Sequence, residues 1–220
     1  FRQLTFLKKV RTPLSEKLAI KAERALRDPN YHFRTLEKRN IDKYIMDFAK
    51  IYNEAWSKYP GVSKLELSQA KLLFAQLKPI LDEKILWFAY HNNDPIGFFI
   101  SIPEMNQIFK YVNGKLDLIG KIKTFYHLKI KKSCKKMVGL VFGIVPKHQG
   151  KGVDGALIMA SRETIQEKLG YEDMELNWIP DFNKSMIRVA EQVQVKLGKI
   201  HHTYRYNFDR TIPVERITNK

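Results

Sequence analysis

The most constraining feature of the chain is an apolar run that ends at a proline and passes through a glycine-rich turn into a helix. The run is MVGLVFGIV (Met137–Val145), and its branched and aromatic side chains show no regular polar alternation. Such a run is typical of a strand that is buried on both faces. Pro146 cannot continue a hydrogen-bonded ladder, so the strand should end there. Gly150, Gly152 and Gly155 then fall within six residues.

The residues after these glycines predict a helix. Apolar and small side chains recur at helical spacing up to Gly170, which is a natural C-cap. They are Leu157, Ala160, Thr164, Ile165 and Leu169. A strand, a glycine turn and a helix in this order present unpaired backbone N–H groups and a positive helix end to a phosphate. The sequence therefore predicts that a phosphate-bearing cofactor binds here.

Composition excludes several classes of protein. The chain has 220 residues, 44% of them hydrophobic and 12% aromatic, which excludes a disordered chain and allows one sizeable core. No apolar run approaches the roughly 18–20 residues that span a bilayer. The single cysteine, Cys134, excludes an intramolecular disulfide and a cysteine zinc site, and it fits a reducing compartment. The adjacent His201 and His202 alternate across a strand, so they form no metal site. We expect a cytoplasmic protein without a metal.

The net charge of +16 is concentrated between Lys121 and Lys136, where seven lysines fall. A solvated surface loop is the usual interpretation of such a stretch. The alternatives are contact with an anionic membrane surface and a lid over an anionic ligand. Nucleic-acid binding ranks lower, because no motif that reads a groove or an RNA accompanies the charge.

The order of the expected elements indicates an α/β fold, with a mixed sheet flanked by helices. The strongly marked β-α-β unit contains the apolar strand, the glycine turn and a right-handed crossover to a parallel strand. We expect a helical extension over residues 1–30 and a single domain over 31–220, with a basic, partly helical insertion at about 107–135. The expected elements are a helix from Thr12 to residue 27, a strand at 31–38, a helix at 41–59, a helix that opens with a Ser63–Glu66 capping box, a hairpin around Asn92–Pro95, strands at 137–145 and 171–179, a helix capped by Asn183, and a last strand at 200–208.

Two familiar phosphate-binding turns fit the glycines poorly. A nucleotide P-loop needs G-x-x-x-x-G-K-[ST], but Gly152 stands where the hydroxyl residue should be, and Val145 replaces the first glycine. The dinucleotide pattern G-x-G-x-x-G is matched from Gly150 to Gly155. However, four residues separate that match from the strand, and Glu175 lies within the next strand instead of at its end.

A third interpretation comes from resemblance. The segment IVPKHQGKGVDGAL is similar to the acetyl-CoA signature of the GNAT acetyltransferase superfamily, Val-x-Pro-x-x-[Arg/Gln]-Gly-x-Gly-x-[Gly/Ala]. The order of elements from Tyr31 to Phe208 is that of the GNAT fold. The stretches SIPEMN and KYVNGKL resemble a branch of bacterial GNAT-like proteins. The signature is matched by Ile144, Pro146, Gln149, Gly150, Lys151 and Gly152.

The resemblance implies an N-acyltransferase that uses acetyl-CoA or another acyl-CoA. An amine of a small molecule or a peptide would attack the thioester directly. The strand backbone would bind the pantetheine arm, the turn and the first helical turn would bind the pyrophosphate, and an asparagine would contact CoA. The implied cofactor residues are Gly143, Ile144, Val145, Gln149, Gly150, Lys151, Gly152, Val153, Gly155 and Asn183.

The sequence departs from the family pattern at two positions. Asp154 stands where glycine or alanine is usual, and the site tolerates it only if its side chain points outward or CoA binding is weak. Ala190 stands where many GNAT enzymes carry a tyrosine that protonates the leaving thiolate. By residue type alone, Ser185, Tyr204 and Tyr206 are substitutes.

Candidate general bases are Glu104, at the end of a hairpin strand, and Glu175, on the strand beside the cofactor. A carboxylate in either position is more commonly an ordinary strand or surface residue. His148, beside the glycine turn, is expected to pack or to contact solvent. The departures leave a second function open, in which the fold binds CoA or an anionic surface without turnover.

Overall fold

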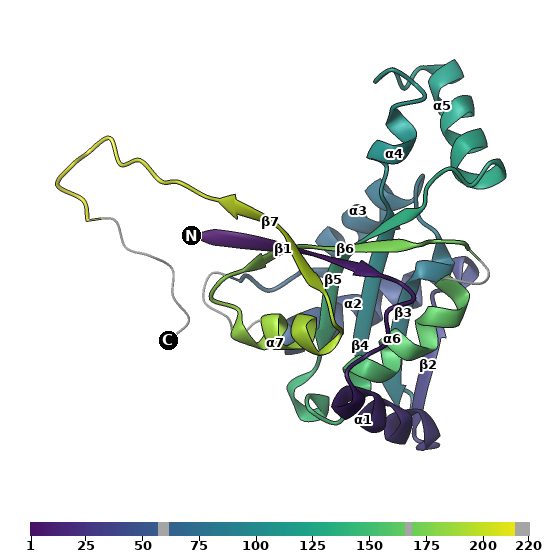
Figure 1. Ribbon diagram of the computed structural model, residues 1–220, viewed down its shortest axis with the longest axis vertical. Coiled ribbons are helices and arrows are strands. Elements are labelled where there is room, and N and C mark those ends of the chain that lie inside the picture. Colours follow the sequence, from purple (N-terminus) through teal and green to yellow (C-terminus); the bar gives the residue numbers. More distant parts are fainter. Residues whose placement is uncertain (57–61, 166–168, 214–220) are drawn as a thin grey trace.

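The computed structural model describes residues 1–56, 62–165 and 169–213 (Figure 1). Its centre is a mixed sheet with strand order β2-β3-β4-β5-β6-β1-β7, so the expected α/β fold is confirmed. The strands are β1 (Arg2–Lys9), β2 (Tyr31–Thr35), β3 (Leu86–His91), β4 (Asp94–Pro103), β5 (Lys136–Ile144), β6 (Asp173–Pro180) and β7 (Lys196–His202). The α-helices are α1 (Glu16–Arg27), α2 (Ile41–Trp56), α3 (Leu67–Leu77), α4 (Asn106–Phe109), α5 (Leu118–Phe125), α6 (Val153–Glu163) and α7 (Lys184–Gln192).

Helices cover both faces of the sheet. Successive residues of a strand point to opposite faces, and the central strand β4 shows both packing layers. The ring of Phe98 lies 4.9 Å from that of Phe48 in α2, and α3 packs behind α2 through Phe74. Phe99 points the other way and lines a small apolar cavity together with Ile158 of α6. Helix α1 packs on α6, and Figure 1 shows the two together.

The predicted hairpin is present as β3 and β4. Its connection consists of Asn92 and Asn93, which both have left-handed backbone angles, with φ of 48° and 68°. Two residues of this kind form the type I′ turn that suits the right-handed twist of paired strands. Pro95 lies just inside β4, near the end of the hairpin, where its missing N–H is tolerated.

The first ten residues correct the prediction of a helical extension over 1–30. Helix α1 is there, but β1 precedes it and lies inside the sheet, antiparallel to both β6 and β7. The sequence pattern does not indicate this strand, because Lys8 interrupts the apolar alternation between Phe6 and Val10. Its ammonium group is buried and donates to the backbone oxygen atoms of Thr12 and Val193 at 2.8 and 2.6 Å. Burial lowers the pKa of Lys8 to about 8.

Helix α3 starts later than its predicted capping box. The box was placed at Ser63–Glu66, but the first helical residue is Leu67. The observed reciprocal contact lies one turn further on, where Oε1 of Gln69 accepts a hydrogen bond of 3.0 Å from the backbone N–H of Glu66. A capping box needs an acceptor three residues after the N-cap, and Gln69 meets that spacing as well as Glu66 does.

The last strand is also shifted from its predicted place. It was expected over residues 200–208 and is observed as β7, which ends at His202. The tyrosines at 204 and 206 and Phe208 lie beyond the sheet, with 87%, 63% and 93% of their surface exposed. The alternation of apolar and polar residues therefore continues past the point where β1 can pair with it, since β1 begins at Arg2.

Residues 107–135 form the predicted basic, partly helical excursion. It contains α4, α5 and a π-helical continuation of α5 over Tyr126–Ile130, and it projects away from the sheet beyond the ends of β4 and β5 (Figure 1). None of the helices in the described ranges is both long and apolar enough to cross a bilayer.

Candidate functional site

The sheet opens between its two parallel strands. Strands β5 and β6 are paired from Lys136 opposite Asp173 to Gly139 opposite Leu176. Beyond Gly139, β5 continues to Ile144 without β6 as a partner. The predicted parallel crossover is present. The edge of β5 beyond Gly139 can therefore bind an extended ligand.

The register of β5 on β4 shows which backbone groups face this opening. Ile144 is opposite Gly97, and the N–H of Val145 donates to the oxygen of Ile96 at 2.9 Å. This bond marks Ile144 as a non-hydrogen-bonded position of the antiparallel ladder, and Phe142, two residues earlier, occupies another. The backbone N–H and C=O groups of Phe142 and Ile144 therefore point away from β4, towards the opening.

This register changes the expected pantetheine contacts. Gly143 and Val145 were predicted to offer backbone groups, but those groups are directed at β4. The backbone groups of Ile144 point into the opening, and so do those of Phe142, which was not among the predicted residues. A bulge lies next to them, because the β4–β5 register slips between Val141 and Gly139 and leaves Leu140 without an opposite residue on β4. Bulges are frequent beside functional sites, since they redirect backbone groups.

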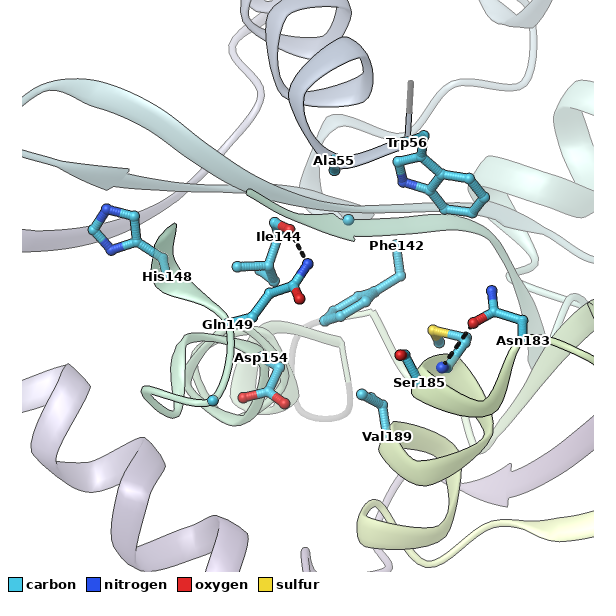
Figure 2. Close-up of a pocket in the computed structure, with 13 residues that line it drawn as sticks. Ala55, Trp56, Phe142, Ile144, His148, Gln149, Asp154, Asn183, Ser185 and Val189 are labelled. Carbon is cyan, nitrogen blue, oxygen red and sulfur yellow. Dashed lines mark hydrogen bonds between the residues drawn. The ribbon is translucent and has the colours of Figure 1, made fainter. Parts of the chain in front are cut away.

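A cavity of about 140 Å³ lies at the open end of β5. Its wall combines the end of α2, the end of β5, the glycine turn, the first turn of α6 and the start of α7 (Figure 2). The lining residues are Ala55, Trp56, Phe142, Gly143, Ile144, His148, Gln149, Gly150, Asp154, Asn183, Ser185, Met186 and Val189.

The glycine turn has the conformation that its sequence demands. Gly150 and Gly152 both have left-handed backbone angles, with φ of 73° and 87°. Helix α6 begins at Val153, and its first backbone hydrogen bond runs from the N–H of Ala156 to the oxygen of Gly152 at 2.8 Å. The N–H groups of residues 153–155 therefore have no partner within the helix. Such groups, together with the helix dipole, favour an anion.

Several glycine-turn residues have packing roles that the sequence did not show. Gly155 faces α1, since a Cβ atom there would lie 2.9 Å from side-chain atoms of Leu18 and Ala22. Val153 is fully buried, and the Lys151 side chain is exposed. Of the predicted cofactor residues, the cavity is lined by Gly143, Ile144, Gln149, Gly150 and Asn183.

Gln149 and His148 fix the turn against the strand. The Gln149 side-chain amide donates to the oxygen of Ile144 at 2.8 Å, which ties the turn to the last residue of β5 (Figure 2). Nδ1 of His148 lies 2.9 Å from the hydroxyl of Tyr31. Burial lowers the pKa of His148, and the neighbouring His91 lowers it further. His148 thus lines the cavity as a neutral ring at neutral pH, at the end next to the glycine turn.

The start of α7 forms the opposite wall. Oδ1 of Asn183 accepts a hydrogen bond of 3.0 Å from the N–H of Met186, so the predicted cap is confirmed, and Asn183 also lines the cavity. The hydroxyl of Ser185 faces the same space (Figure 2). Ala190 is fully buried and does not line the cavity. Because Tyr204 and Tyr206 lie beyond β7, Ser185 is the substitute that the structure brings to the cavity.

Asp154 faces the cavity. It lies in the first turn of α6, and its side chain is half-buried and lines the space beside the unpaired N–H groups (Figure 2). An outward orientation would have separated this carboxylate from a bound pyrophosphate, but the structure shows the opposite arrangement. A negative charge here favours the helix and opposes a second anion at the same helix end.

The two predicted bases lie elsewhere. Neither Glu104 nor Glu175 lines the cavity. Oε1 of Glu104 accepts a hydrogen bond of 3.1 Å from the N–H of Asn106 at the start of α4. Glu175 is buried and accepts hydrogen bonds from the ammonium groups of Lys136 and Lys199 at 3.0 and 3.1 Å. The geometry gives both carboxylates structural partners.

Glu175 is also poorly suited to accept a proton. Burial acts to raise the pKa of this carboxyl, but the hydrogen bonds from Lys136 and Lys199 outweigh burial and hold the pKa below its ordinary value of 4.5. A general base works best when its pKa lies near the operating pH. Glu175 is therefore a fixed anion that joins β6 to β5 and β7.

We expect Glu175→Gln to lower the free energy of unfolding by about 1–2 kcal/mol at neutral pH, because two hydrogen bonds lose their charge. A carboxyl with a lowered native pKa stabilises the fold above pH 4.5, and this contribution is lost as the pH falls through the native pKa. Urea unfolding of both proteins between neutral pH and pH 3 measures the effect. The difference between them should shrink on acidification; a constant difference would show that the charge of Glu175 does not stabilise the fold.

No motif in the sequence indicated that the end of α2 would line the cavity. Trp56 stacks on Tyr52, with ring centroids 5.9 Å apart, and lies against β5. A Cβ atom at Gly143 would lie 3.0 Å from the indole Nε1 of Trp56, so the glycine makes room for this ring. Ala55 and Trp56 precede the glycine turn by some ninety residues, and only the fold brings them together. Phe142, by contrast, lies in the predicted strand, but its direction towards the opening follows from the β4–β5 register, which comes from the structure.

Known proteins provide the next comparison. No protein-family model matches the chain. A bacterial ceramide synthase from Caulobacter vibrioides is 27% identical over 175 residues, which cover 78% of this chain and 44% of that protein. Protein YghO from Escherichia coli is 19% identical over 174 residues, with the same coverage of both chains. The chain thus spans less than half the length of these curated relatives.

Solved structures share the architecture at low sequence identity. A GCN5-related N-acetyltransferase from Sphaerobacter thermophilus superposes with a TM-score of 0.54, at 10% identity, over 90% of this chain and 49% of that chain. A GCN5-related glucosamine N-acetyltransferase region of a fungal multi-domain protein gives 0.55, at 10% identity, over 91% and 20%. An aminoglycoside acetyltransferase from a soil metagenomic sample gives 0.53, at 11% identity, over 82% and 99%. The expected GNAT fold is thus confirmed, and the chain has the architecture of the GCN5-related N-acetyltransferases.

Proposed function

We propose that the protein is an N-acyltransferase that moves an acyl group from acyl-CoA to an amine. The observation that carries this proposal is the opening between β5 and β6, where the backbone groups of Phe142 and Ile144 face a cavity that ends at the glycine turn. An extended pantetheine arm fits such an edge as an added strand would, through backbone hydrogen bonds. The N–H groups at the start of α6 then suit the pyrophosphate.

Direct transfer of the acyl group mainly requires that the protein position the amine and the thioester. The amine nitrogen attacks the thioester carbon, the C–S bond breaks, the amine gives up a proton and the sulfur leaves as a thiolate that takes one up. We assign stabilisation of the oxyanion to the backbone N–H of Phe142, which points into the opening beside the Leu140 bulge. Ser185 is a hydroxyl on the cavity wall that could supply the proton to sulfur.

The names of the similar proteins suggest which kinds of amine to test as acceptors. A ceramide is the amide of a fatty acid and a long-chain amino alcohol, so the name of the Caulobacter relative denotes N-acylation of a lipid amine. The aminoglycoside acetyltransferase, a structural neighbour, is named for a soluble amine. We propose acetyl-CoA or a longer acyl-CoA as donor and an amine as acceptor, with lipid amines first among the acceptors to test.

A second function is favoured by Asp154 and Ala190. The first places a carboxylate where a pyrophosphate would lie, and the second removes the usual hydroxyl of the family. Together they support a protein that binds CoA weakly, or binds an anionic surface, without turnover.

Amine-dependent release of free thiol separates the two functions. The assay uses acetyl-CoA and a long-chain acyl-CoA with a panel of soluble and lipid amines, and mass spectrometry identifies the product. We expect steady release of CoA with an N-acylated product for at least one amine. No thiol release above the background without protein, although acyl-CoA binds, would support the function without turnover. Thiol release that is independent of amine would indicate hydrolysis of the thioester and would contradict both functions.

A further inference from the structure

Helix α5 carries an apolar face that points away from the protein. We call this surface the α5 face. Side chains three and four residues apart lie on the same side of a helix, and the side chains at this spacing in α5 are large and apolar. Between 47% and 74% of the surface of each is exposed. The α5 face consists of Leu118, Ile119, Ile122, Phe125, Tyr126 and Ile130. Monomeric soluble proteins rarely expose such a contiguous apolar patch without a use for it.

The opposite side of the same helix is anchored to the fold. Leu128 packs against the main core, and the ring of His127 stacks on that of Tyr111 with centroids 3.9 Å apart. The ends of the excursion are also joined, because Oε1 of Gln107 accepts from the N–H of Lys135 at 2.8 Å. The α5 face is therefore held outward by specific contacts, at a place that projects from the sheet (Figure 1).

Lysines border the α5 face. Within the helix, Lys121 and Lys123 lie on either side of the apolar stripe, and both are exposed. Lys131 and Lys132 are exposed directly after it. Residues 107–135 contain eight lysines and one acidic residue, Asp117, whose carboxylate caps α5 by accepting from the N–H of Gly120 at 2.8 Å.

We propose that the α5 face binds the surface of an anionic lipid bilayer, with its apolar side chains among the acyl chains and its lysines on the head groups. An amphipathic helix with basic borders and aliphatic and aromatic tips is the form that such interfacial elements take. A second copy of the chain fits less well, since each partner would bring its lysines against those of the other. A nucleic acid would use the charge but leave the apolar side chains without a role.

This inference does not rest on the proposed acyl transfer, because the face lies outside the cavity. It would place the protein where a lipid amine is found, if lipid amines are its acceptors. The two proposals can fail separately, since thiol release from a soluble amine needs no bilayer and vesicle binding needs no turnover.

Vesicle sedimentation of the full chain tests the proposal, with phosphatidylcholine vesicles that contain or lack phosphatidylglycerol. Wild-type protein should sediment with the anionic vesicles. The double variant Ile122→Ser, Phe125→Ser should lose at least tenfold in binding, because apolar burial is removed. The triple variant Lys121→Gln, Lys123→Gln, Lys131→Gln should lose about a hundredfold, since each lysine near an anionic surface contributes about fivefold.

Matched controls change the same residue types elsewhere. Leu72→Ser, Leu73→Ser removes two exposed apolar side chains from α3, and Lys17→Gln, Lys71→Gln, Lys78→Gln removes three exposed charges from other surfaces. Both should bind vesicles as the wild type does, and circular dichroism shows that all variants are folded. In Phe125→Trp, quenching of the added indole by brominated lipid should report insertion.

Several results would overturn the proposal. Among them are an absence of sedimentation with anionic vesicles, and equal loss in the lysine control, which would indicate a general effect of net charge. Unchanged binding of the Ile122→Ser, Phe125→Ser variant would also do so. Self-association that this variant abolishes, without vesicle binding by the wild type, would show that the α5 face joins two copies of the chain.

Discussion

Replacing Asp154 by asparagine is expected to tighten the binding of CoA about 5- to 150-fold. The carboxylate lines the cavity at the N-terminus of α6, where the unpaired N–H groups would hold a pyrophosphate. Two charges about 6 Å apart repel each other by roughly 1–3 kcal/mol for effective dielectric constants between 80 and 20. Since about 1.4 kcal/mol corresponds to a tenfold change in affinity, asparagine should recover a factor in this range.

Isothermal titration of the two proteins with CoA and with pantetheine measures this effect. Pantetheine lacks the pyrophosphate, so its affinity should be the same for both proteins. Asp42→Asn serves as the control, because it removes an exposed carboxylate of α2 and changes the net charge equally. Equal affinities of the wild type and Asp154→Asn for CoA would mean that the pyrophosphate does not lie at this helix end.

Replacing Gly152 by alanine is expected to lower the free energy of unfolding by about 2–5 kcal/mol. Two costs combine, since a left-handed residue other than glycine costs about 1–2 kcal/mol and overpacking costs about 1–3 kcal/mol. The φ of Gly152 is 87°, and a Cβ atom there would lie 2.4 Å from backbone atoms of Lys21 in α1. A backbone cannot move aside as a side chain can, so α1 and the turn would have to separate.

Gly150→Ala is the matched comparison for this prediction. Its φ is 73°, but no atom of the residues that the structure describes lies within 4 Å of a Cβ atom built there. The free energy of unfolding of Gly150→Ala should therefore fall only by the backbone cost of about 1–2 kcal/mol. Urea unfolding of the three proteins measures the difference. Equal destabilisation of the two variants would show that α1 does not press on the turn at Gly152.

The glycine turn and the strand before it were predictable because their signals are local. Pro146 ends β5, the glycines adopt the angles that only they adopt readily, and the apolar run of β5 requires cover on both faces. The β3–β4 hairpin was predictable for the same reason, since Asn92 and Asn93 sit between two apolar runs. In each case the residues that determine the geometry lie next to each other in the chain.

The parts that could not be predicted depend on contacts between distant segments. Strand β1 has a lysine in a core position, and Lys8 is tolerated because the backbone oxygen atoms of Thr12 and Val193 accept hydrogen bonds from its ammonium group. Trp56 reaches the cavity from the end of α2, which nothing near the glycine turn indicates. The inward direction of Asp154 depends on the rotation of α6 about its axis, and that rotation is fixed by packing on α1.

The charge of the basic stretch could be predicted from its sequence, but its exposed apolar face could not. The lysines from Lys121 to Lys136 were evident, but two of them are engaged within the fold, because Lys129 pairs with Asp82 and Lys136 with Glu175. The apolar residues between them would ordinarily be assigned to a core. Their exposure on α5 is visible only in the structure, and it changes the interpretation of the stretch from a charged loop to an amphipathic surface.

A crystal structure of the protein grown with acyl-CoA tests the central claim most directly. We expect density for the pantetheine arm between β5 and β6, hydrogen-bonded to backbone groups of Phe142 and Ile144. The pyrophosphate should lie on the N–H groups at the start of α6, beside the glycine turn. Density for CoA at another surface, or a cavity that stays empty of CoA at saturating concentration, would contradict the account.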